Sequence, residues 1–196
     1  MHFCGEGIVG IIPRTTMAAL LVALASGTAA AQQQPNKDVY FRAVADFFKL
    51  SPTEVSILAD WHLSPDEIPV VLFVAHQAGV SPEALVALRT SGKSWSDLAR
   101  RYQVDASHFY VPLPDTADPG ILRAAYERYR ALPAARWGEV SLADADIVAL
   151  VNVRVLAQTL RRTPAQVIRA AAAGRSFVDV FGSLLRDGGT GAQERM

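Results

Sequence analysis

An internal repeat is the feature that most constrains how this chain can fold. Residues 81–99 align without gaps on residues 163–181, with four identical positions and six close substitutions. Chance alone gives about one identity over such a length at ordinary composition. Repeats of this kind are supersecondary units used more than once. We therefore predict a tandem duplication, with units near residues 50–110 and 136–186.

Each copy of the repeat is typical of two helices joined by a tight corner. A hydroxyl residue caps the first helix, and a proline takes its first position, where a missing N–H costs nothing. A glycine ends that helix in the left-handed conformation, and a serine caps the next helix, whose third residue is aspartate. An aromatic residue follows the serine, and we expect it to pack inward, because the two copies share only its bulk. These residues are Ser81, Pro82, Gly92, Ser94, Trp95 and Asp97 in the first copy, and Thr163, Pro164, Gly174, Ser176, Phe177 and Asp179 in the second.

The segments between these corners predict an all-α fold. Residues 68–75 form an apolar run short enough for a strand, but the corresponding run at 147–160 is longer than most strands. We therefore expect both to be helices. Residues 54–58 and 139–142 leave open one minor, short strand pair. For the first helix two starts are possible: at Pro65 with a distorted first turn, or at Pro69 after a turn over residues 64–68.

The amino terminus predicts export. Arg14 precedes an apolar run over residues 17–25, and small residues follow up to Ala31, which is the layout of a secretory signal peptide. The run is too short to span a bilayer. We predict cleavage after Ala31 and a mature protein in the periplasm or outside the cell. The alternative is that Met17 is the true start. Cys4 lies in the predicted signal, so the mature chain would carry no thiol.

The predicted organisation is one packed body built from consecutive segments. The signal peptide covers residues 1–31, and an amino-terminal helix with the first helical unit covers 32–110. A Pro-rich linker and a connecting helix follow at 111–135, then the second unit at 136–186. Residues 187–196, like residues 32–36, are polar or glycine-rich and predict a flexible tail. The linker is too short for two freely separate domains.

Nucleic-acid binding is not expected, although residues 94–105 have the spacing of the first helix and turn of a helix-turn-helix. A recognition helix should follow, but Pro112 and Pro114 leave barely one helical turn. The 19 Lys and Arg residues balance 19 Asp and Glu residues, so no net charge attracts a polyanion. A DNA-binding function stays open only if the amino terminus is not a signal peptide.

Enzymatic function has one weak candidate site. One short turn contains Asp60, His62 and Asp66. These residues could bind a metal ion or act in a metal-dependent or acid-base hydrolase. The simpler interpretation is that Asp66 and Glu67 supply negative charge to a helix amino terminus. The sequence contains no H-E-x-x-H or G-x-S-x-G motif. Gly92 is not part of a phosphate loop, because Ala87 stands where the first glycine would be. No cofactor is predicted.

The corner motif resembles one found in uncharacterised secreted bacterial proteins, which share SPxxLxxLRxSGxSWxDL and a later SPxxVIRxxxxGxSF. The resemblance covers most of the predicted mature chain. It implies an exported helical protein and carries no activity, cofactor or catalytic residue. Two helical units with covering helices form grooves, and the sequence contains no evident reactive cluster. The function class that we expect is a periplasmic protein-interaction or scaffold module with a protein partner.

Overall fold

The structure, a computed structural model, describes residues 26–172 and 174–193, and these residues form helices, turns and irregular segments without any strand. The all-α prediction is therefore confirmed. The elements are α1 (Ser26–Phe48), α2 (Pro52–Ala59), η1 (Pro65–Glu67), α3 (Ile68–Ala78), α4 (Pro82–Thr90), α5 (Trp95–Arg101), α6 (Ala106–Phe109), η2 (Gly120–Leu122), α7 (Arg123–Arg130), η3 (Ala134–Glu139), α8 (Asp144–Thr159), α9 (Pro164–Ala171) and α10 (Phe177–Gln193).

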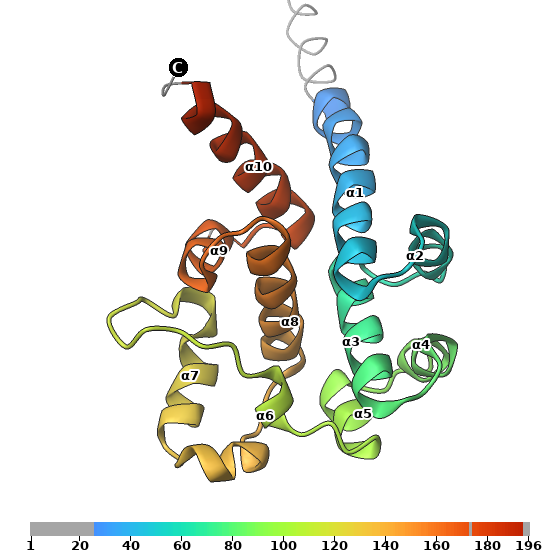
Figure 1. Ribbon diagram of the computed structural model, residues 1–196. Helices are drawn as coiled ribbons and strands as arrows, with labels where there is room; N and C mark the ends of the chain where they lie inside the picture. Colours follow the sequence, from blue (N-terminus) through green and yellow to red (C-terminus); the bar gives the residue numbers. More distant parts are fainter. Residues whose placement is uncertain (1–25, 173, 194–196) are drawn as a thin grey trace, which may run out of the picture.

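Helices α3 and α8 pack against each other at the centre of the molecule (Figure 1). Every residue of α3 from Ile68 to Ala75 is buried, and α8 is buried around most of its circumference. A helix that is apolar on all sides is stable only when other elements surround it. Helices α4 and α5 cover one side of this pair, α9 covers the other, and α1 packs on both α8 and α10. One continuous core results, as predicted for a single packed body.

A fully buried asparagine on α8 joins three elements. The Tyr40 hydroxyl on α1 donates a hydrogen bond to Asn152 Oδ1. The Asn152 amide nitrogen donates to the carbonyl oxygens of Asp66 and Val148, each at 2.8 Å. All the polar atoms of this side chain are therefore paired, as burial away from water requires. The amide connects α1, η1 and α8.

Both corners have the predicted backbone geometry. Gly92 has φ 92° and Gly174 has φ 65°, so both lie in the region that favours glycine. The Ser94 hydroxyl accepts a hydrogen bond from the Asp97 N–H at 3.0 Å, and the Ser176 hydroxyl accepts one from the Asp179 N–H at 3.2 Å. The duplication that we inferred from these two corners stays a prediction.

The helices that precede the corners also begin as predicted. Ser81 accepts a hydrogen bond from the Ala84 N–H, and Thr163 forms a reciprocal capping box with Gln166. Pro82 and Pro164 take the first helical positions. Trp95 and Phe177, the aromatic residues at the corners, are buried.

The prediction of a minor strand pair is wrong. Residues 54–58 lie inside α2, where the Glu54 carboxylate accepts a hydrogen bond from the Ser51 N–H at 2.8 Å and so fixes the helix start. Val140, in the other predicted strand, does have extended backbone, with φ −65° and ψ 130°. The start of α3 corresponds to the first of the two alternatives, since a 3₁₀ turn from Pro65 leads directly into the helix.

Both terminal helices are longer than predicted. Residues 32–36 were expected to be irregular, but they lie inside α1, although Pro35 removes one main-chain donor from the helix interior. Helix α10 continues to Gln193, through most of the segment 187–196, although glycine is unfavourable in a helix interior. The predicted signal peptide lies outside the described residues up to residue 25, and residues 26–31 belong to α1.

Candidate functional site

Asp66, one of the candidate metal or acid-base residues, caps a distant helix. Both of its carboxylate oxygens lie 3.0 Å from the Phe177 main-chain nitrogen at the start of α10 and accept its N–H. Burial raises the pKa of the Asp66 carboxyl, while the N–H groups of Phe177 and Val178 oppose this rise. Asp66 therefore connects the first unit to the last helix across 111 residues of sequence.

Asp60 and His62 do not join Asp66 in a common site. Both are exposed, and His62 Nδ1 lies 3.0 Å from the main-chain carbonyl oxygen of Asp60 rather than from its carboxylate. Within residues 26–172 and 174–193, no group of three or more His, Cys, Asp or Glu side chains is arranged to hold a metal ion. The structure thus gives these residues separate local roles.

Glu67 and Arg89 form a polar network behind the first corner. Arg89 Nε donates to Glu67 Oε1 at 2.8 Å, and Arg89 Nη1 donates to Asp144 Oδ2 at 2.9 Å. The Trp95 indole N–H also donates to Glu67 Oε1, at 2.8 Å. Asp144 Oδ1 accepts the Ser96 N–H at 3.2 Å. These bonds hold α5 against the starts of α3 and α8, so the charges serve to position the helices.

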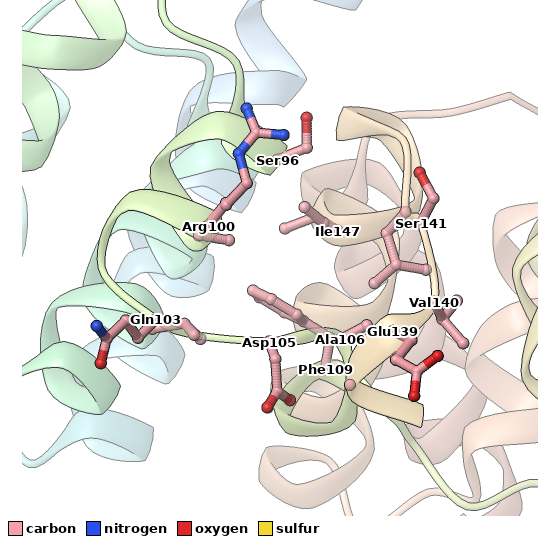
Figure 2. Close-up of a pocket in the computed structure, with 14 residues that line it drawn as sticks. Ser96, Arg100, Gln103, Asp105, Ala106, Phe109, Glu139, Val140, Ser141 and Ile147 are labelled. Carbon is pink, nitrogen blue, oxygen red and sulfur yellow. The ribbon is translucent and has the colours of Figure 1, made fainter. Parts of the chain in front are cut away.

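A cleft of about 370 Å³ lies between α5 and α6 on one side and η3 and the start of α8 on the other (Figure 2). This volume is at the low end of the range for small-molecule sites. Its lining is apolar below and polar at the rim. The apolar residues are Ala99, Val104, Ala106, Phe109, Val140, Leu142 and Ile147, and the others are Ser96, Arg100, Gln103, Asp105, Gly138, Glu139 and Ser141.

Small residues form part of the lining of the cleft. Ala99 on α5 and Ala106 on α6 contribute only a methyl group each. Gly138 lies directly beside Asp105, since a Cβ at Gly138 would be 3.0 Å from Asp105 Oδ2. A contact of that length is tighter than almost all real Cβ contacts. Larger residues at these positions would fill the space or push the walls apart.

The two walls are held in place by interactions behind the cleft. Asp105 caps α6 by accepting the Ser107 N–H at 2.9 Å. On the opposite side, the Trp137 indole of η3 donates to the Tyr129 carbonyl oxygen at 3.0 Å, and its ring lies 4.0 Å from the Tyr110 ring, centroid to centroid. These contacts hold the two walls of the cleft in place.

The rim carries opposite charges at its two ends. Figure 2 shows Arg100 at one end and the carboxylates of Asp105 and Glu139 at the other. Hydrogen bonds from Ser107 lower the pKa of Asp105, and the Arg136 guanidinium lowers the pKa of Glu139. Both carboxylates are therefore ionised at neutral pH.

One wall of the cleft is an extended segment with unpaired main-chain groups. Val140 has φ −65° and ψ 130°, and Ala143 has φ −76° and ψ 160°. Val140 and Leu142 are buried, whereas Ser141 between them is exposed. Val140 N–H donates to the Trp137 carbonyl at 3.2 Å, and Ala143 N–H donates to Asp146 at 3.0 Å. Among the described residues, none forms a hydrogen bond with the main chain of Ser141 or Leu142.

The lining of the cleft combines apolar side chains with hydroxyl, amide and charged groups. It contains no histidine or cysteine, so neither Ser96 nor Ser141 has an imidazole base beside it. No sequence motif predicts this cleft, because its walls come from residues about 40 positions apart. The only sequence signal was the extended character predicted for residues 139–142.

No known protein family, curated protein or solved structure matches this chain. Across the part of the chain that the structure describes, no helix is both long and apolar enough to cross a membrane.

Proposed function

We propose that this protein is an exported protein-interaction module of the bacterial periplasm, and that the cleft of Figure 2 holds a segment of its partner. The observation that carries the proposal is the cleft itself: an apolar floor, a charged rim and unpaired main-chain groups in one wall. Apolar floors supply affinity, and polar groups at the rim supply orientation and specificity. The predicted signal peptide supports a location outside the cytoplasm.

The two other function classes have less support. A metal-dependent or acid-base hydrolase would use Asp60, His62 and Asp66, but Asp66 is engaged by the N–H of Phe177. A DNA-binding helix-turn-helix would place a recognition helix after α5, where α6 has only 4 residues, from Ala106 to Phe109. A helix of that length offers about one turn to a major groove.

Site-specific photo-crosslinking in the native host tests the proposal. A photoreactive amino acid replaces Arg100 at the cleft rim or, as a matched control, Arg123 on α7. Both arginines are exposed and each pairs with one aspartate, so neither replacement disturbs the core. We expect a covalent adduct with one partner protein from position 100 and none from position 123. The absence of an adduct at position 100, or equal adducts at both positions, would contradict the proposal.

A further inference from the structure

We infer that the occupant of the cleft is an extended peptide segment of the partner, with a basic side chain at one end, which pairs its main chain with Ser141. This inference rests on the proposed function and specifies the chemistry of the ligand. The first reason is the backbone of the wall. Val140 and Ala143, on either side of Ser141 and Leu142, have extended backbone, and the N–H and C=O groups of Ser141 have no partner among the described residues. An extended peptide is the ligand that satisfies such groups, by adding a strand beside them.

The floor of the cleft suits the side chains of an extended segment. In such a segment alternate side chains point the same way, about 6.5 Å apart along the chain. Side chains at positions i and i+2 can then face the floor beside Ala99, Val104 and Ile147, while the side chain between them points to water. We therefore expect small or medium apolar residues at two alternate positions of the peptide.

The charges at the rim of the cleft determine which end of the peptide carries a basic side chain. The carboxylates of Asp105 and Glu139 lie away from Arg100 along the cleft (Figure 2), and Arg136 pairs with Glu139 there. A lysine or arginine of the peptide next to the two carboxylates gains attraction, whereas a carboxylate there is repelled. The expected ligand is apolar at alternate positions and basic at the end nearest Glu139.

An amphipathic helix fits the same surface less well. A helix with its side chains is about 10–12 Å wide, and its internal main-chain groups already pair with each other. It could therefore not satisfy the Ser141 groups, and a cleft of about 370 Å³ accommodates only a side chain or two of such a helix.

Selection from a random octapeptide library displayed on phage, with the protein purified from a host that expresses the full chain, tests this inference. We expect enriched sequences with apolar residues at i and i+2 and a basic residue at one end. Enrichment of sequences with apolar residues at i, i+3 and i+4, or of no sequences at all, would overturn it.

A matched pair of variants tests the main-chain contact with the enriched peptide. Ser141→Pro removes the N–H, and the preceding residue, Val140, already has the extended backbone that proline demands. Ser141→Ala removes the hydroxyl and keeps the N–H. We expect Ser141→Pro to weaken peptide binding by about five- to tenfold and Ser141→Ala to leave it unchanged. Equal affinity of the two variants would refute the main-chain contact.

Two further measurements complete the test. N-methylation of the peptide, one residue at a time, should weaken binding to the unmodified protein by about five- to tenfold at the position whose N–H pairs with Ser141, and this holds even if Ser141→Pro does not fold. Glu139→Lys should reverse the preference from a basic to an acidic end residue. If position 100 forms a crosslink but every N-methylated peptide still binds, the proposed function is supported and this inference is wrong. Loss of both the crosslink and the selected peptides removes both.

Discussion

Replacement of Asp66 tests whether this carboxylate is a helix cap or part of a reactive site. In Asp66→Ala the Phe177 N–H at the start of α10 loses its acceptor, and Phe177 is only 6% exposed, so water cannot easily replace it. Loss of a cap costs about 0.5–2 kcal/mol, and a buried unpaired donor costs about 1–3 kcal/mol. These are two descriptions of the same lost bond, so we expect a decrease of about 1–2 kcal/mol in the free energy of unfolding.

Two companion variants separate the cap from other effects. Asp66→Asn keeps an acceptor oxygen and should lose less than Asp66→Ala. Asp60→Ala removes an exposed carboxylate that forms no side-chain hydrogen bond in the described structure, and should change stability by less than about 0.5 kcal/mol. Urea denaturation followed by circular dichroism measures all three. Equal losses for Asp60→Ala and Asp66→Ala would refute the capping role.

The pH dependence provides an independent test of Asp66. Burial raises its pKa above the ordinary value of 3.8, so the folded protein holds this proton more tightly than the unfolded chain does. The contribution of Asp66 to stability therefore falls as pH rises from that value through the raised pKa, and is constant above it. Asp66→Asn lacks this term, so its stability relative to wild type should increase across that window. A relative decrease would show that the N–H groups of α10 outweigh burial.

Three other predictions concern the corner, the core and export. Gly92→Val should lower the free energy of unfolding by more than the roughly 1 kcal/mol of a left-handed residue with a Cβ, although no atom lies within 4 Å of that Cβ, whereas Lys93→Ala should be silent in the same thermal unfolding assay. Asn152→Ala should cost about 2–4 kcal/mol, because it leaves the buried Tyr40 hydroxyl and the Asp66 carbonyl without their partner; a loss below 1 kcal/mol in urea denaturation would contradict this role. Amino-terminal sequencing of the processed protein should begin at Gln32, and an unprocessed cytosolic protein would contradict export.

The corners could be predicted from sequence because their determinants are local. A capping serine, a glycine with positive φ and a proline at the first helical position act within a few residues of one another, and the fold leaves them in place. The apolar run of α3 was also assigned correctly, but only by comparison with the longer run of α8, since periodicity does not distinguish a short buried strand from a helix.

The remaining features depend on contacts between distant residues. The hydrogen bond from the Phe177 N–H to Asp66 shows that this candidate catalytic carboxylate caps a helix, and no local sequence pattern predicts that bond. The extended segment at Val140 was anticipated, but its predicted partner is helical because Ser51 and Glu54 start α2 there. The cleft lies between α5, α6 and η3, so it can be recognised only after these elements are packed together.

Amide hydrogen exchange of Ser141, measured by NMR with and without the enriched peptide, tests the role of the cleft most directly. In the free protein this N–H has no acceptor among the described residues, so we expect rapid exchange. On saturation with peptide, exchange at Ser141 should slow by about tenfold or more, while Ala143, already bonded to Asp146, changes little. Unchanged exchange at Ser141 with peptide bound, or protection confined to α1 and α10, would contradict the proposed binding site.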